Sequence, residues 1–126
     1  MILFACTIPG RCYVKKNGAK RVGRGKNTRM IYTRNYTAWA ADAILELKQA
    51  WKGQNPIECE IEATFKFYFK DKQAEADTSN LCEAPADALT DAGIIKDDIL
   101  IYKLIAEKYF YTDQKVEIEI RRYKND

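Results

Sequence analysis

Histidine is absent from the 126-residue chain. Without an imidazole, Ser-His-Asp and Cys-His catalysis and histidine-ligated metal sites are excluded. The four cysteines, Cys6, Cys12, Cys59 and Cys82, form no Cys-x-x-Cys pair, which argues against a structural zinc site and favours reduced, buried thiols. If the protein is an enzyme, its chemistry must come from carboxylates, lysines, tyrosines or a hard metal ion.

Long apolar runs are also missing. No stretch approaches the length of a membrane span. The apolar N-terminus has no basic region ahead of it and meets Pro9-Gly10 too soon for a signal peptide. We therefore expect a cytoplasmic protein without membrane contact. No glycine–lysine phosphate-binding loop occurs, so no nucleotide cofactor is expected. The 47% apolar content predicts one compact domain over residues 1–126.

Acidic residues are lacking from the first third of the chain. Residues 1–41 hold nine Lys and Arg and no Asp or Glu, whereas the remainder holds twelve basic and eighteen acidic residues. Residues 11–29 are rich in glycine, with little apolar periodicity, which predicts a mobile loop. So many like charges are unfavourable without an anion, so we predict contact with phosphates; a solvated loop is the alternative. The candidate DNA-binding residues are Lys15, Lys16, Lys20, Arg21, Arg24, Lys26 and Arg29.

Apolar spacing elsewhere predicts the elements of an α+β domain. Residues 36–51 have the three-four spacing of a helix, with Asn35 as N-cap and Gly53 as its end. Trp39 and Trp51 fall in its apolar stripe and are predicted to be core residues. Strict alternation over 57–69 predicts a long strand with one dry face, and further strands are predicted over 2–8, 99–110 and 116–121. We expect a mixed sheet of about four strands packed against two helices.

The segment 76–100 concentrates negative charge. Thr78 or Ser79 can cap a helix that Gly93 closes, and Pro85 predicts a kink or a later start of that helix. Carboxylates this dense repel one another unless something positive lies among them. The acidic residues of the segment are Asp77, Glu83, Asp87, Asp91, Asp97 and Asp98.

Carboxylates at the two ends of this segment suggest a metal site. Asp77 precedes the helix, and Asp97 and Asp98 follow its exit. They would meet if the following strand pairs beside the strand that delivers Asp77. Such a group suits Mg²⁺ or Mn²⁺, which favour oxygen ligands. The alternative is an exposed acidic helix with a capping aspartate at its start, which is common in proteins.

The segment also resembles a known family. Its pattern is similar to that of the RusA-type Holliday-junction resolvases, crossover-junction endodeoxyribonucleases often encoded by phages and prophages. In that family the run is approximately D-x-D-N-L-x-K-x-x-x-D-A-L-x-x-A-G-x-x-x-D-D. The matching run here is Asp77-x-x-Asn80-Leu81, then Asp87-Ala88-Leu89-x-x-Ala92-Gly93-Ile94-x-x-Asp97-Asp98.

The resemblance implies a homodimer that cuts four-way DNA junctions in recombination and repair, with Asp77 and Asp98 as catalytic metal ligands and Asp97 adjacent. Two departures stand out: the family's second aspartate is here Ser79, and its helix lysine is here Glu83.

Two hypotheses account for these departures. Either Glu83, one helical turn after Ser79, supplies the missing ligand, with Asp97 or Asp87 orienting ligands or water; or the site has lost a ligand and the protein only binds branched DNA. A third class, a structural or protein-binding domain that uses the acidic helix, would have no affinity for DNA.

Overall fold

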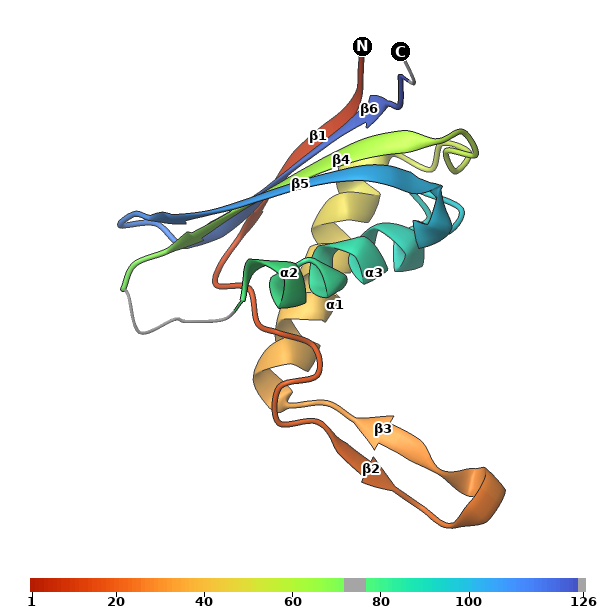
Figure 1. Cartoon of the computed structure of the whole chain (residues 1–126), viewed down its shortest axis with the longest axis vertical. Coiled ribbons are helices and arrows are strands. Elements are labelled where there is room, and N and C mark those ends of the chain that lie inside the picture. The colour runs from red at the N-terminus through yellow and green to blue at the C-terminus, as the bar shows by residue number, and fades with distance from the viewer. Residues whose placement is uncertain (72–76, 125–126) are drawn as a thin grey trace.

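A four-stranded mixed sheet, covered by helices on one face, forms the body of the protein (Figure 1). The structure is a computed structural model that describes residues 1–71 and 77–124. The strands are β1 (Ile2–Pro9), β2 (Lys20–Val22), β3 (Arg29–Ile31), β4 (Ile61–Phe69), β5 (Ile101–Phe110) and β6 (Lys115–Arg122). The helices are α1 (Arg34–Trp51), α2 (Thr78–Leu81) and α3 (Glu83–Asp91), with 3₁₀ turns η1 (Gly25–Asn27) and η2 (Asp98–Leu100). The predicted α+β class is confirmed.

The main sheet has the strand order β1-β6-β4-β5. β4 and β5 are parallel, and the other pairs are antiparallel. Alternate residues of β4 are buried from Ile61 to Phe69, as the alternation predicts. The strand is shorter than the predicted 57–69, because Ile57 forms only an isolated bridge with Ile95. Helices α2 and α3 make the crossover that joins the two parallel strands.

Helix α1 buries the stripe that its sequence predicts. Trp39 and Trp51 are 5% and 7% exposed, which confirms them as core residues. The N-cap is Thr33, not the predicted Asn35, because the Thr33 side chain accepts a hydrogen bond from the amide of Tyr36 at 3.3 Å. Thr33 and Asn35 are both favourable N-cap residues, and the hydrogen bond to Tyr36 shows that Thr33 is the one used.

The acidic helix is interrupted, as Pro85 predicts. α2 ends at Leu81 and α3 begins at Glu83. A proline ring clashes with the carbonyl four residues earlier, and that residue is Leu81. Pro85 thus lies in the first turn of α3, where proline is tolerated. Gly93, with φ of 76°, follows α3 and ends it as expected.

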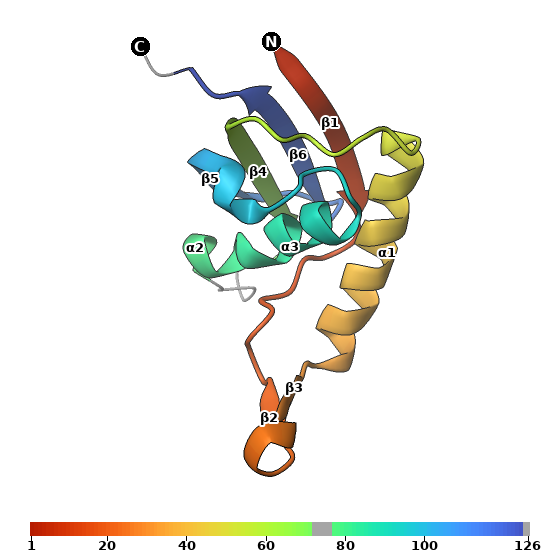
Figure 2. The same ribbon diagram turned by 90° about the vertical axis from the view of Figure 1, so that its right-hand side faces the viewer.

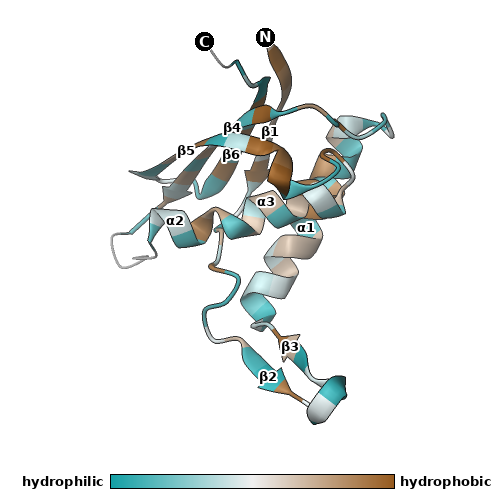
Figure 3. Cartoon of the chain, turned by 45° about the vertical axis from the view of Figure 1, so that its right-hand side comes forward, coloured by the Kyte–Doolittle hydropathy of each residue, from teal (hydrophilic) through white to brown (hydrophobic). Residues whose placement is uncertain are grey.

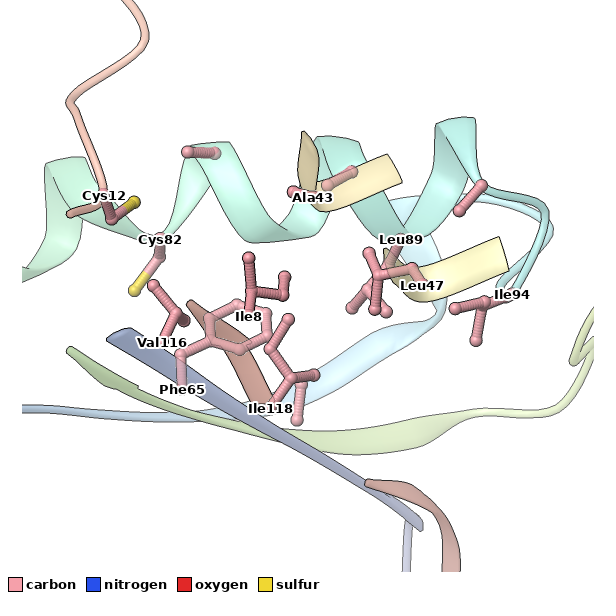
Figure 4. Packing of buried hydrophobic residues seen from close by; sticks show 14 of the residues in the cluster. Ile8, Cys12, Ala43, Leu47, Phe65, Cys82, Leu89, Ile94, Val116 and Ile118 are labelled. Carbon is pink, nitrogen blue, oxygen red and sulfur yellow. The ribbon is translucent and has the colours of Figure 1, made fainter. Parts of the chain in front are cut away.

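The core lies between the sheet and the helices. In Figure 4, Ile8, Phe65 and Ile118 of the sheet pack below Leu47 of α1 and Leu89 of α3, and each of the five is at most 2% exposed. In Figure 3, hydrophobic stretches are prominent along the strands of the main sheet, while the turn of the hairpin is mostly hydrophilic. All four cysteines are free; Cys12 and Cys82 are buried, and Cys6 and Cys59 are half-buried.

The loop predicted over residues 11–29 is found only in part: residues 11–19 form no helix or strand, whereas the segment from Lys20 onward folds into a hairpin. β2 and β3 pair as an antiparallel hairpin, with Lys20 opposite Ile31 and Val22 opposite Arg29. The hairpin extends away from the body beyond the start of α1 (Figures 1 and 2). Of the helices in the described chain, none has both the length and the apolar character needed to span a membrane.

Candidate nucleic-acid interface and acidic site

The projecting hairpin carries most of the candidate DNA-binding residues. Its five basic side chains are exposed and no acidic residue accompanies them. Gly23 makes its turn possible: its φ is 101°, and a Cβ there would lie only 2.2 Å from the carbonyl oxygen of Asn27. The hairpin therefore presents a positive surface away from the core. Its basic residues are Lys20, Arg21, Arg24, Lys26 and Arg29.

Lys15 and Lys16 lie elsewhere, beside the acidic helix α3. The Lys15 ammonium donates a hydrogen bond to the carboxylate of Asp87, which is 72 residues away in sequence. The Lys16 Nζ atom lies 3.7 Å from Oε1 of Glu83. The segment that leads to the hairpin is thus tied by two ion pairs to the helix that carries the candidate catalytic residues. Nothing in the sequence pattern indicated this pairing.

Lys15 stays charged in this environment. Its Nζ atom lies 5.2 Å from the centre of the Tyr32 ring, and its side chain is 22% exposed. Burial alone lowers the pKa of Lys15, but the hydrogen bond and the charge of Asp87 outweigh it, so the net shift is upward. The partly buried Lys15–Asp87 pair is therefore a fixed feature of the fold.

Tyr36 forms the inner wall beside this ion pair. Burial raises its pKa to about 12, with Asp87 and Asp91 adding to the effect and Lys15 opposing it. The ion pair with Lys15 thus holds the carboxylate of Asp87 close enough for its charge to act on Tyr36. This arrangement suits a residue that orients its neighbours.

Asp97 and Asp98 form a second acidic group at the start of η2. The Asp97 Oδ1 atom accepts a hydrogen bond from the amide of Ile99 at 3.2 Å. The pKa of Asp98 is raised, first by a hydrogen bond shared with Asp97, then by burial and by the negative charges of Asp97 and Asp87. The pKa of Asp97 is lowered by its hydrogen bonds from Ile99 and Asp98. Asp97 and Asp98 therefore shift each other's pKa in opposite directions, and the charge of Asp87 adds to the rise at Asp98.

Asp77 lies at the start of α2 and is exposed. Its carbonyl oxygen accepts a hydrogen bond from the Leu81 amide at 3.1 Å, but its side chain caps no backbone group. Among residues 1–71 and 77–124, no three cysteine or acidic side chains lie close enough together to hold a metal ion. The predicted set Asp77, Glu83 and Asp98 is therefore not gathered into a three-ligand cluster.

The donor chemistry nevertheless fits Mg²⁺ or Mn²⁺. The candidate ligands are all carboxylates, and two of them, Asp97 and Asp98, are adjacent at the start of η2. Mg²⁺ commonly binds through one or two carboxylates, with substrate phosphates and waters completing its shell. A three-carboxylate cage is therefore not required for this ion.

Comparison with known protein families identifies the family of this chain. The family model described as endodeoxyribonuclease RusA matches residues 9–121. That range runs from the end of β1 into β6 and includes the hairpin and the whole acidic segment. A search of curated proteins finds no match. Because the family model covers nearly the whole chain, the protein belongs to the RusA endodeoxyribonuclease family, whose members resolve Holliday junctions.

Proposed function

We propose that this protein resolves four-way DNA junctions by hydrolysing phosphodiester bonds with the help of Mg²⁺ or Mn²⁺. The observation that carries the proposal is the pairing of the acidic helix with a cationic segment, Lys15 with Asp87 and Lys16 with Glu83, in a chain of an endodeoxyribonuclease family. Anionic groups suit a hard cation, and the cationic segment suits a phosphate backbone.

In this proposal Asp77, Asp98 and Glu83 hold the ion, which when bound would lower the pKa of a water and offset charge on the scissile phosphate. Asp97 and Asp87 act as orienting residues. The hydrogen bond between Asp97 and the Ile99 amide, and the pairing of Asp87 with Lys15, support that role because each fixes a carboxylate relative to the backbone.

Glu83 can serve as a ligand only after a change of partner. Its side chain is 38% exposed and lies beside Lys16, which is 71% exposed. An exposed ion pair of this kind contributes little to stability, so it is readily exchanged. A DNA phosphate offers Lys16 another anion, and the carboxylate of Glu83 is then released. Arrival of DNA would thus complete the ligand set.

The hairpin holds the DNA backbone in this proposal, together with Lys15 and Lys16. Contacts of Lys and Arg with phosphates carry no base sequence. Selectivity for a junction therefore comes from the shape of the DNA and from the spacing of two active sites in a homodimer. The exposed edge of β5, with Tyr102 at 61% and Leu104 at 47% exposure, supports a dimer because an unpaired apolar edge favours association.

The decisive experiment compares cleavage of a synthetic four-way junction by the wild-type protein with Mg²⁺, with Mn²⁺ and with a chelator. Wild type should cut only with the ion. Asp77→Asn should bind the junction as wild type does and fail to cut it, while Asp42→Asn, an exposed carboxylate on α1, should cut normally. Salt-sensitive binding without any cutting would establish the alternative, a branched-DNA-binding protein. Absence of DNA binding even at low salt would reject both.

A further inference from the structure

The face of the sheet turned away from the helices carries a cluster of aromatic side chains at one end. Tyr68 of β4 and Tyr109 of β5 stack with ring centres 5.0 Å apart and an interplanar angle of 17°. Tyr111, just after β5, meets Tyr68 edge-on at 6.1 Å. Lys115 of β6 lies 4.9 Å from the centre of the Tyr68 ring and 5.5 Å from that of Tyr111. We call Tyr68, Tyr109, Tyr111 and Lys115 the tyrosine cluster.

Strand register brings these residues together. Tyr68 pairs with Tyr109 on one side and with Lys115 on the other. Its neighbour Phe69 is buried on the helix side, so Tyr68 lies on the open face. By the same alternation Phe110, between Tyr109 and Tyr111, lies on the opposite face from both. The cluster is thus a product of the sheet and not of a flexible loop.

The hydroxyl groups of Tyr68 and Tyr109 already have hydrogen-bond partners. Tyr68 donates to the carboxylate of Glu117, and Tyr109 donates to Oε2 of Glu107 at 2.8 Å. These bonds hold the rings in place while leaving ring faces available. Tyr109 stacks on Tyr68 through one face only, and β5 is the edge strand, so no strand of the described sheet covers its other face. Tyr111 is 53% exposed.

Charge on this surface is nearly balanced. Lys66 and Lys115 lie on the open face, but Glu107 and Glu117 lie there with them. A duplex backbone is held by an excess of positive charge, which this face lacks. An exposed aromatic ring suits the π-face of an unpaired base, and Lys66 and Lys115 supply positive charge beside it for the backbone of a single strand.

The cluster lies where an unpaired base would be useful. β4 ends at Phe69, one residue after Tyr68, and the chain then continues to Asp77 at the start of α2. In Figure 1, α2 lies toward the end of the sheet at which β4 finishes and β5 turns into β6. The tyrosine cluster therefore occupies the end of the sheet from which the acidic segment departs.

We propose that unpaired bases at the branch point of the DNA stack on Tyr109 and Tyr111, held by the tyrosine cluster. This proposal rests on the proposed function for the branched DNA that supplies the bases. The stacking of bases on tyrosines does not depend on cleavage. It assigns unpaired bases to the open face of the sheet and duplex backbone to the hairpin. Stacking is tolerant of sequence, so the surface would accept any base.

The test uses the full-length protein and a short single-stranded oligonucleotide carrying the fluorescent base 2-aminopurine, whose emission is quenched by stacking. Wild type should quench the probe. Tyr111→Ala and Tyr109→Ala should each weaken binding about tenfold, the loss typical of one base–aromatic contact. Tyr111→Phe should retain quenching because it keeps the ring. Phe110→Ala provides the matched control, since Phe110 is 55% exposed on the same strand but on the other face.

Equal quenching by wild type, Tyr109→Ala and Tyr111→Ala would overturn the proposal, as would an equal loss in Phe110→Ala. The thermal unfolding midpoint of each variant is measured, so that only variants that are folded at the assay temperature are compared with wild type. Cleavage of a fully paired four-way junction separates this proposal from the proposed function. If wild type quenches the probe through its tyrosines but cuts no junction, the stacking surface stands and the nuclease proposal fails. If wild type cuts the junction but does not quench the probe, the nuclease proposal stands and the stacking proposal fails.

Discussion

The ammonium nitrogen of Lys16 lies 3.7 Å from Oε1 of Glu83 at the start of α3. Sequence alone presented these residues as members of two unrelated groups, a phosphate-binding segment and a metal site. In the folded chain they neutralise each other. In the proposed function this pair would link DNA binding to the carboxylates, because a phosphate that attracts Lys16 would remove the cation from Glu83.

Glu83 and Lys16 are expected to act in opposite directions on the metal requirement. Glu83→Gln removes a proposed ligand and should raise the Mn²⁺ concentration for half-maximal cleavage by about tenfold or more. Lys16→Gln frees the carboxylate and should lower that concentration. Cleavage is measured across a Mn²⁺ titration with saturating junction, so that weaker DNA binding does not enter. Unchanged metal dependence in Glu83→Gln would remove Glu83 from the ligand set.

Charges on the hairpin should set the salt dependence of junction binding. Replacing Lys20, Arg24 and Lys26 by Gln should weaken binding and reduce the slope of log affinity against log salt by about 0.9 for each phosphate that is no longer neutralised. Fluorescence anisotropy at several salt concentrations measures this slope. Lys48→Gln, an exposed change in the last turn of α1, serves as the control and should leave the slope as in wild type.

Hairpin geometry should matter independently of its charge. Gly23→Ala would place a Cβ 2.2 Å from the Asn27 carbonyl oxygen, so the turn must rearrange. Gly25→Ala also introduces a side chain at positive φ, 57°, but meets nothing within 4 Å. We therefore expect a larger loss of junction affinity from Gly23→Ala than from Gly25→Ala at equal thermal stability of the body. Equal affinities would show that the hairpin contributes charge without a defined shape.

The two tryptophans of α1 should respond differently to replacement by phenylalanine. The Trp51 indole N–H donates to the carbonyl of Gln54 at 2.8 Å. The buried Trp39 N–H has no partner among the described residues. Trp51→Phe should therefore lower the free energy of unfolding by about 1 kcal/mol more than Trp39→Phe, because the latter also removes an unpaired buried donor, which offsets its poorer packing. Urea unfolding of both variants measures the difference.

Three of the eight tyrosines, Tyr36, Tyr68 and Tyr109, have a raised pKa, and the shift is large for the first two. The pKa of Tyr36 is raised to about 12, mainly by burial, and that of Tyr68 to about 12, mainly by its hydrogen bond to Glu117. Between pH 10 and 12 the unfolded chain then binds fewer protons than the folded chain, so the free energy of unfolding falls as pH rises. The stabilisation from these two tyrosines is fully present below pH 10. Phenolate absorbance should lose a late component in Tyr36→Phe and in Tyr68→Phe. Simultaneous titration of all tyrosines near pH 10 would contradict this.

Long periodic segments made most of the fold predictable. The alternation in β4 and the three-four spacing in α1 extend over enough residues to specify both element and buried face. The hairpin was missed because β2 and β3 have three residues each, too few for alternation to show, and because glycine is equally common in loops and tight turns. The start of α1 was misplaced by two residues, since Thr33 and Asn35 are both good caps and only the cap bond distinguishes them.

The candidate site was predictable in composition but not in arrangement. The spacing of Asp77, Asp87 and Asp98 indicated the family, and the family model bears this out. The ion pair of Lys15 with Asp87 joins segments 72 residues apart, and the tyrosine cluster depends on the register of three strands. Pairings across such distances are decided by tertiary packing, which single-sequence patterns do not carry.

The strand order has a consequence for how the protein is made. Within the described sheet, β6 is the one strand that pairs with β1, and β6 lies between β1 and β4. During synthesis, β1 therefore cannot pair in the sheet until the chain has been made to about residue 122. A chain that stops before β6 lacks the strand that joins β1 to β4. The four-stranded sheet can therefore close only after β6 has been synthesised.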